Sequence, residues 1–276
     1  MPEFTEPQIR LGIFIGLFVL LALLEYLMPR RSPKPVKARR WMTNWAIVII
    51  DSVVVRLLFT GAAVGAALWA EANGYGLFNQ IETPDWVALA VSFIILDFAI
   101  WFAHWASHKV PVLWSVHRMH HADVDFDVTT GIRFHPVEIV LSMLWKFVIV
   151  IGFGAPALAV LVFEIVLNGT SMFNHSNLRL PIALDRVLRM LIVTPDMHRV
   201  HHSIIHNETD SNYGFNLAIW DRLFRTYCDQ PSRGHDQMTI GIEEWQDEKP
   251  TEVFWSLSVP LLKQNAIRAQ YNPKGK

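Results

Sequence analysis

The sequence predicts an all-α integral membrane bundle that carries a histidine-rich cap on its cytosolic side. Hydrophobic residues make up 52% of the 276 residues and charged residues only 18%, which is an apolar composition for a soluble domain. Several long apolar runs are close to the length that spans a bilayer. Nine of the twelve histidines gather in four clusters, which lie directly after or between those runs.

The first apolar run covers residues 11–28 and holds one charged residue, Glu25, near its end. It ends in Met-Pro-Arg-Arg without a small-residue cleavage site, so we expect a retained anchor. The loop that follows contains six cations: Arg30, Arg31, Lys34, Lys37, Arg39 and Arg40. The positive-inside rule places this loop in the cytosol and the short N-terminus outside.

The second run covers residues 45–70 and includes Asp51 and Arg56. A lipid-facing helix tolerates such charges poorly, so we expect both to face other helices or to lie near the cytosolic end. The third run, residues 86–103, leads directly into the first pair of histidines.

The fourth and fifth runs cover residues 137–152 and 156–173. They are separated by Gly152, Gly154 and Pro156, which predicts a helical hairpin. If the basic loop is cytosolic, the second run leaves the cytosol, the third returns, and the hairpin leaves and returns. All four histidine clusters are then expected on the cytosolic face.

The clusters contain nine candidate metal ligands: His104, His108, His117, His120, His121, His175, His198, His201 and His202. Positions i, i+3 and i+4 share one face of a helix, so we expect each His-x-x-His-His triplet to converge on one side of one turn. One metal ion rarely takes more than six ligands, so nine imidazoles favour two metal ions. Imidazole suits iron, zinc and copper alike. Cys228 is the single cysteine, which excludes a thiolate site.

Eight further residues are candidates for orienting the ligands or for lining the entry of a substrate: Asp97, His135, Glu138, Glu164, Asn168, Asp196, His206 and Asp210. Asp97 shares a helical face with His104 and His108 and could accept the second ring proton of a ligand. Glu164 and Asn168 share a face of the fifth run. A carboxylate and an amide inside an apolar helix indicate either a functional site or hydrogen bonds between helices.

Three alternating aspartates and one remaining histidine are expected outside the site. Asp123, Asp125 and Asp127 resemble a calcium-binding loop but lack its glycine and its distal glutamate, so we expect a solvated loop. His235 has no neighbouring ligand in the sequence and is expected at the surface.

Together these motifs resemble the fatty acid hydroxylase superfamily, and more narrowly its sterol desaturase-type members. The resemblance rests on His-x3-His at residues 104–108, on His-x2-His-His at 117–121, and on the segments 129–138, 173–177, 195–202 and 212–227. It covers about residues 85–230, in the order that the family shows. Many fatty acid 2-hydroxylase members have a further histidine four residues before the position of His175. Ser171 stands there in this chain, which disfavours that branch.

The resemblance implies a membrane enzyme with a cytosolic diiron centre whose ligands are the nine histidines. Such an enzyme uses dioxygen and two external electrons to hydroxylate or desaturate a C–H bond of a lipid. No haem-binding or flavin-binding segment is visible in the sequence, so we expect a separate donor such as a ferredoxin or cytochrome b5. The membrane would be a bacterial inner membrane or the endoplasmic reticulum.

The expected organisation has three parts. Residues 1–84 would form transmembrane helices with the basic loop, residues 85–230 the catalytic domain, and residues 231–276 a cytosolic tail, of which 266–276 would be a loose end. The net charge of −1 gives no sign of nucleic-acid binding.

Two other functions fit some of the same features. A membrane metal-binding protein or metal transporter would place polar ligands across the midplane, whereas these clusters lie at the ends of apolar runs. A metal-dependent hydrolase would need a glutamate placed as in His-Glu-x-x-His, which none of the clusters has. The lipid itself stays open, with fatty acyl, sterol, ether, sphingoid and carotenoid chains all compatible.

Overall fold

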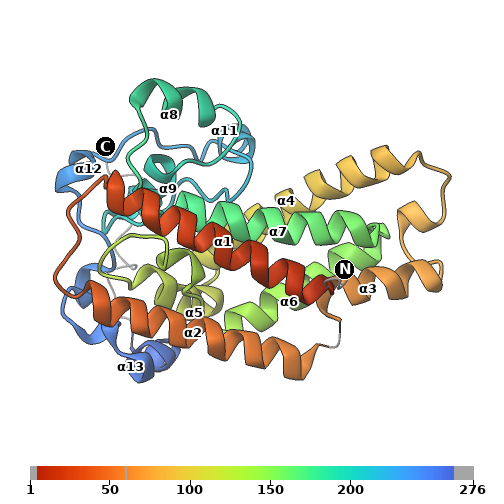
Figure 1. The fold of residues 1–276 in the computed structure, drawn as a ribbon, viewed down its shortest axis with the longest axis horizontal. Coiled ribbons are helices and arrows are strands. Elements are labelled where there is room, and N and C mark those ends of the chain that lie inside the picture. Colours follow the sequence, from red (N-terminus) through yellow and green to blue (C-terminus); the bar gives the residue numbers. More distant parts are fainter. Residues whose placement is uncertain (1–4, 60, 264–276) are drawn as a thin grey trace.

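The computed structural model describes residues 5–59 and 61–263, and every regular element in that part of the chain is helical. Figure 1 shows long helices that extend side by side from a cap of short helices and loops. The prediction of an all-helical bundle is confirmed. The described parts of the chain contain three isolated bridges but no strand, and these bridges pair Pro29 with Leu178, Ile192 with Leu217, and Ser203 with Ile240.

The helices divide into a long set and a short set. The long set and its junction with the cap are α1 (Glu6–Leu27), α2 (Lys37–Leu58), α3 (Ala62–Ala72), α4 (Asp85–Lys109), α5 (Pro111–His121), α6 (Pro136–Phe153) and α7 (Ala157–Asn174). The short set is α8 (Ile182–Leu188), α9 (Pro195–His201), α10 (His206–Thr209), α11 (Ile219–Leu223), α12 (Gly234–Gln237) and α13 (Val253–Ser258). Single 3-10 turns cover Leu77–Asn79, Thr130–Ile132, Glu243–Trp245, Lys249–Thr251 and Val259–Leu261.

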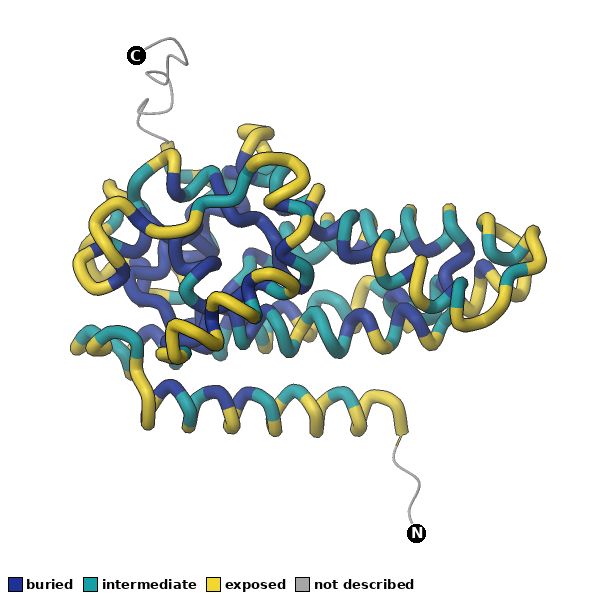
Figure 2. The backbone as a smooth tube through the Cα atoms, turned by 90° about the horizontal axis from the view of Figure 1, so that it is seen from above, coloured by how far each residue is buried: buried dark blue, intermediate teal, exposed yellow. Residues whose placement is uncertain are grey.

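The outer faces of the long helices are apolar and exposed. Within the described residues, five helical segments are long and apolar enough to cross a membrane. Large side chains such as Leu20, Leu57 and Val148 lie on their surface at 50%, 80% and 62% exposure. Figure 2 shows that buried residues concentrate in the interior of the cap, while exposed and intermediate residues recur along the helices that leave it. Since a soluble protein does not expose so much apolar surface, the chain is a multi-pass membrane protein.

The second apolar run is two helices rather than the one expected over residues 45–70. Helix α2 already begins at Lys37 and ends at Leu58, and α3 begins at Ala62. Gly61 separates them with a φ of 72°, a left-handed conformation that glycine adopts without strain. Helix α3 then packs against α6 and α7 at the end of the bundle far from the cap.

The predicted hairpin is confirmed by α6 and α7. Helix α6 ends at Phe153, where Gly154 takes a φ of 65° and caps it in the left-handed conformation. Pro156 then precedes the first residue of α7. Because α7 runs back toward the cap, its C-terminal end delivers His175 to the other histidines.

A buried charge cluster fixes the cap to α2. The guanidinium of Arg40 donates to Asp123 and to Asp127 over 2.8 Å each, and all three side chains are at most 5% exposed. Asn44, one turn further along α2, donates to the same Asp123. Although burial opposes ionisation, Arg40 lowers the pKa of Asp123 to about 2. The expectation of a solvated aspartate loop is therefore wrong, because a cation 83 residues earlier in the chain pairs with it.

The first part of the expected C-terminal tail packs onto the cap. The side chain of Arg118 in α5 donates to the carbonyls of Val259 and Leu262, each over 2.6 Å. Helix α13 also contacts α2. The segment expected to be a loose end, 266–276, lies outside the described residues.

Gly131 lets the loop before α6 approach α7 closely. A Cβ atom at this position would lie 2.6 Å from the carbonyl oxygen of Ser171, whose Oγ donates to the carbonyl of Gly131. We expect Gly131→Ala to destabilise the fold by about 1–3 kcal/mol, because the backbone of α7 must shift. The measurement is thermal unfolding of the purified protein in detergent. Gly152→Ala is the control, since a Cβ there meets nothing within 4 Å, and an equal loss in both variants would contradict this reason.

Candidate metal centre

The nine candidate histidines come together in the cap as two groups. The first group is His104, His108, His117, His121 and His201, and the second is His120, His175, His198 and His202. In each group the ring nitrogens that could bind a metal lie within 4.8 Å of one another. All nine side chains are buried. The predicted meeting of the four clusters at one end of the bundle is therefore observed.

Each His-x-x-His-His triplet divides between the two groups. In α5, His117 and His121 belong to the first group and His120 to the second. At α9 the division is reversed, since only His201 of that triplet joins the first group. The spacing predicts that each triplet converges on one side of its helix, whereas the structure divides each triplet between two groups. An α-helix turns about 100° per residue, so positions i+3 and i+4 point about 100° apart and can serve two neighbouring sites.

The distances between ring nitrogens fit metal ligands. Nε2 of His104 lies 3.1 Å from Nε2 of His117 and 3.0 Å from Nε2 of His201. In the second group, Nε2 of His175 lies 3.1 Å from Nε2 of His120. Neighbouring ligands of a metal with bonds of about 2.1 Å lie about 3 Å apart when they meet at a right angle. Each group therefore has the donor set and the spacing for one metal ion.

The second ring nitrogen of five ligands is held by an acceptor. Nδ1 lies 2.6–3.0 Å from an oxygen in the pairs His104–Tyr213, His120–Arg133, His175–Ser171, His201–Ser211 and His117–Glu138. In the first four pairs the oxygen is a backbone carbonyl, which can only accept. Nδ1 therefore carries the proton, and Nε2 presents its lone pair to the centre of the group.

Burial keeps six of the cap imidazoles neutral. Burial, and then the closeness of other imidazoles, lowers the pKa of five of them well below the ordinary value: His120, His121, His198, His201 and His202. Burial also lowers the pKa of His175 to about 3. Neutral imidazole is the form that binds metals, so these residues are ready to bind at physiological pH.

The loop between α10 and α11 supplies two of the carbonyl acceptors. Its Asn212 has a φ of 49°, a left-handed value that asparagine adopts more readily than most residues. The Asn212 side chain donates to the carbonyls of Met197 and Cys228, which fixes the loop against α9. The carbonyls on either side of Asn212, at Ser211 and Tyr213, can then accept from two ligand histidines.

Two of the eight orienting candidates contact ligand histidines. Glu138 accepts from Nδ1 of His117 over 2.6 Å, and an oxygen of Asp210 lies 3.4 Å from Nδ1 of His108. Carboxylates at the outer nitrogen of a ligand fix its orientation and raise its basicity.

Two candidates inside the bundle have other partners. Asp97 accepts from the indole of Trp220 over 2.7 Å, which fastens α11 to α4. Glu164 accepts from Arg10 and Lys146 over 2.8 and 2.6 Å. Among the described residues neither carboxylate shares a hydrogen bond with a ligand histidine. Both fasten helices together, which is the second of the two roles considered for such residues.

Three candidates lie in the cap beside the site. Nδ1 of His135 caps α6 by accepting from the backbone N–H two residues later. His206 forms an ion pair with Asp210 when protonated, at 3.3 Å. Asp196 lies 3.7 Å from Nε2 of His235. His235 is itself only 4% exposed, so the expectation that it lies at the surface is wrong.

An apolar cavity leads from the first group into the bundle. It has a volume of about 490 Å³, reaches His104 and His117, and is lined by parts of α1, α2, α4, α5, α6 and α7. Apolar side chains such as Phe14, Ile100 and Leu141 form much of its wall, and the remaining candidate, Asn168, also lines it. A cavity of this size and character suits a lipid chain.

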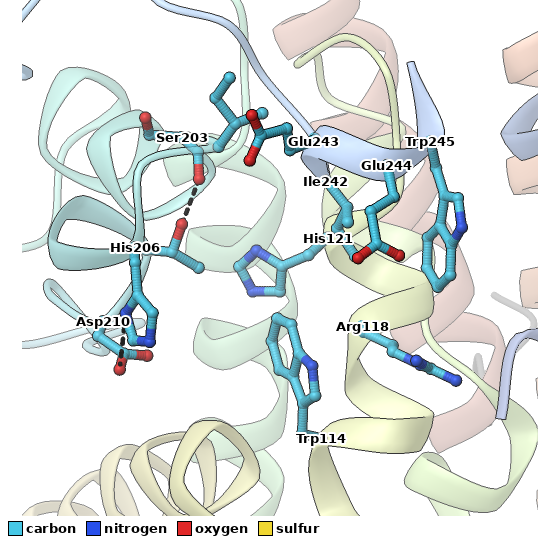
Figure 3. Close-up of a pocket in the computed structure, with 13 residues that line it drawn as sticks. Trp114, Arg118, His121, Ser203, His206, Asp210, Ile242, Glu243, Glu244 and Trp245 are labelled. Atoms are coloured by element: carbon cyan, nitrogen blue, oxygen red, sulfur yellow. Dashed lines mark hydrogen bonds and ion pairs between the residues drawn. The ribbon is translucent and has the colours of Figure 1, made fainter. Parts of the chain in front are cut away.

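A smaller pocket of about 130 Å³ lies on another side of the first group. Figure 3 shows the imidazole of His121 at this pocket, with Trp114 on one side and the segment that carries Glu243 and Glu244 on another. Asp210 also lines it. The first group is thus bordered by a large apolar cavity and by a small pocket whose wall includes charged side chains.

The contact between Glu138 and His117 makes a testable prediction. We expect Glu138→Ala to weaken metal binding by about 10–100-fold, because His117 loses the acceptor that orients its ring. Glu138→Gln should lose much less metal affinity, since the amide oxygen can accept the same hydrogen bond from His117. Metal content after dialysis against a graded chelator series measures this. Equal losses in the two variants would show that the hydrogen bond does not orient the ligand.

Several known proteins are similar to this chain. It is 31% identical to an alkylglycerol monooxygenase of Xenopus tropicalis over 84% of this chain and 49% of that protein. It is 25% identical to the ornithine lipid hydroxylase OlsE of Rhizobium tropici, over 79% of this chain and 67% of that protein. It is 31% identical to the fatty acid hydroxylase vlmA of a Lecanicillium species, over 52% of this chain and 43% of that protein. The chain thus spans about half the length of the alkylglycerol monooxygenase. No solved structure matches it.

The family model for fatty acid hydroxylases matches residues 89–226. This match covers half of the chain and includes all nine histidines of the two groups. The resemblance to the fatty acid hydroxylase superfamily is confirmed, and the relatives above are lipid hydroxylases or monooxygenases by name. The chain therefore belongs to the fatty acid hydroxylase family.

Proposed function

We propose that the two histidine groups bind two iron ions and that the chain uses dioxygen to hydroxylate a C–H bond of a membrane lipid. The observation that carries this proposal is the pair of buried imidazole groups beside an apolar cavity that begins at His104 and His117. The named activities of the relatives support lipid oxidation in particular. All nine histidines are assigned as ligands, five to one ion and four to the other.

Iron at these positions would supply the activation of dioxygen. One oxygen atom enters the C–H bond, and the other is reduced to water with two electrons and two protons. The reaction therefore needs an electron donor, for which we propose a separate protein such as a ferredoxin or cytochrome b5. The chain contributes the orientation of the imidazoles through their Nδ1 hydrogen bonds and a cavity wall that excludes water.

We further propose that the cap faces the cytosol, where such donors are found. The segment from Arg30 to Arg40 enters the cap, and its cations support this orientation by the positive-inside rule. Residues 85–230 are assigned to the catalytic domain. Residues 1–84 and 231–276 are assigned to its support, as membrane helices and cap respectively. A bacterial inner membrane and the endoplasmic reticulum both satisfy this arrangement.

Comparative lipidomics tests the function. The chain and its His201→Ala variant are expressed in the same host, and the extracted lipids are compared by mass. We expect a lipid that gains one oxygen with the unchanged chain and not with the variant. A product that has lost two hydrogens instead would identify a desaturase. Identical lipid profiles, with both proteins in the membrane fraction and a donor system supplied, would refute lipid oxidation and leave a metal-binding or metal-transport role.

A further inference from the structure

Two buried carboxylates inside the bundle differ sharply in their surroundings. Glu164 is 4% exposed and pairs with Arg10 and Lys146. Asp51 is 5% exposed, yet its Oδ1 has no hydrogen-bond partner. Within residues 5–59 and 61–263, no salt bridge to Asp51 is found either.

An unpaired carboxyl in this position has a cost. A buried carboxyl without a hydrogen-bond partner lowers the free energy of unfolding. An apolar side chain of similar size at the same position would raise it. Ionisable residues inside membrane-spanning helices mark binding or transport sites by default. Since Asp51 does not fasten helices together as Glu164 does, its partner is expected to be a ligand.

The position of Asp51 identifies where that ligand binds. Asp51 lines the 490 Å³ cavity that reaches His104 and His117. It lies seven residues after Asn44, which is fixed in the cap by Asp123. Seven residues of α-helix span about 10 Å, so Asp51 lies well inside the bundle from the cap. A lipid in the cavity can therefore contact the metal centre and Asp51 at two different points.

We propose that Asp51 binds a hydroxyl group of the lipid substrate and thereby sets which carbon reaches the metal centre. This inference rests on the proposed lipid hydroxylation and adds the chemical class of the lipid, a neutral one with a hydroxyl. The lipid would enter with its hydroxyl toward Asp51 and an apolar carbon toward His104 and His117. The distance between these two points would select the carbon that is attacked.

The charges around the cavity favour a neutral hydroxyl over a charged head group. Arg10 and Lys146 carry two positive charges, and Glu164 and Glu138 balance them with two negative ones, because an unpaired buried carboxyl such as Asp51 is neutral. An ammonium would leave this buried region with excess positive charge, and a phosphate would be repelled by two carboxylates. A hydroxyl can donate to a carboxylate or accept from a carboxylic acid, so it matches either form of Asp51.

Binding without turnover tests the proposal. The metal-loaded protein is held in detergent without dioxygen or reductant, and the dissociation constants of radiolabelled 1-hexadecanol, hexadecane, hexadecylamine and hexadecyl phosphate are measured for each variant. Asp51→Leu keeps the size of the side chain and removes the acceptor. Ser52→Ala is the matched control on α2, because Ser52 is exposed and bonds only within its own helix. Comparison of variants for one probe cancels the partitioning of that probe into micelles.

We expect Asp51→Leu to weaken the binding of hexadecanol by about tenfold or more and to leave hexadecane unchanged or tighter. Ser52→Ala should change the binding of neither hexadecanol nor hexadecane. Asp51→Leu should also raise the melting temperature, because it removes an unpaired buried carboxyl. The proposal would be overturned if Asp51→Leu weakens the binding of hexadecanol and hexadecane equally, or lowers the melting temperature. It would also be overturned if Asp51→Leu weakens the binding of the amine or the phosphate more than that of the alcohol.

These outcomes are separate from the test of the function. If the protein prefers hexadecanol through Asp51 but oxidises no lipid, the hydroxyl site stands and the oxygenase proposal fails. If the protein hydroxylates lipids while Asp51→Leu leaves the preference for the alcohol intact, the oxygenase stands and the hydroxyl site fails.

Discussion

His120→Ala and His201→Ala should each reduce the iron affinity of the protein by more than about 100-fold and abolish lipid hydroxylation. His120 belongs to one group of ligands and His201 to the other, so the two variants test the two metal positions separately. Both rings are fully buried, and each donates its Nδ1 proton to a carbonyl. Iron content and product formation by the purified variants are the measurements.

His206→Ala is the matched control for this pair. Its imidazole lies in the cap near the same groups, yet its side chain is 41% exposed and belongs to neither group. This variant should keep its iron and at least half of its activity. Normal product formation by His120→Ala or His201→Ala would refute the assignment of these residues as ligands. All three variants should be found in the membrane fraction, because the apolar helices are unchanged.

Arg40→Met should lower the stability of the cap by about 3–5 kcal/mol, because it leaves Asp123 and Asp127 buried without their cation. Iron loading should fall as well, since Asn44, a neighbour in the same network, accepts from Arg133, whose carbonyl holds His120. Thermal unfolding in detergent measures the first effect and metal analysis the second.

The preceding residue of α2 provides a close control. Arg39 forms ion pairs with Glu248 and Glu252, but its side chain is 45% exposed. Arg39→Met should therefore cost no more than about 1 kcal/mol. If the two variants lose the same stability, the buried cluster is not what fixes the cap to α2.

The same cluster predicts how stability depends on pH. The pKa of Asp123 is lowered from 3.8 to about 2 in the folded protein. A lowered pKa stabilises the fold at pH values above the ordinary pKa, and this contribution is lost as the pH falls through the folded value. Unfolding measured between pH 5 and pH 2 should therefore show a loss of stability in the unchanged protein. Arg40→Met should lose less stability over this range, because ionisation of its aspartates no longer forms ion pairs with Arg40.

Patterns of residue type explain how the architecture and the ligand histidines could be predicted. Apolar runs of membrane-spanning length give the long helices directly, and the glycines and proline between α6 and α7 give the hairpin. The sidedness of the runs then brings His104 and His175 to the same end of the bundle, although they are 71 residues apart. Histidine is rare enough that nine clustered residues of this type stand out against the rest of the chain.

The groups that orient the ligands could not be predicted in the same way. Four ligand histidines donate to backbone carbonyls, at Arg133, Ser171, Ser211 and Tyr213. Every residue has a carbonyl, so no residue type marks these acceptors. Asp97 has the right residue type and shares a helical face with His104, but its carboxylate binds Trp220. The one partial signal is Asn212, a residue type that favours the left-handed turn from which two of these carbonyls extend.

The division of the triplets and the charge cluster depend on long-range packing. Helical periodicity places the three histidines of a triplet near one another, but the positions of α5 and α9 relative to each other decide which metal each one faces. The partner of Asp123 is Arg40, which the sequence presents as one cation of a basic loop. Burial of that arginine follows only once α2 and the cap are packed together.

Counting metals in the purified protein tests the central claim most directly. The protein is purified with iron supplied and without chelators, and metal per chain is measured by inductively coupled plasma mass spectrometry. The two histidine groups predict about two iron ions per chain in the unchanged protein and about one in His201→Ala, because the second group keeps its four histidines. A single metal ion per chain in the unchanged protein, or two iron ions still bound in the variant, would contradict a two-iron centre built from these nine histidines.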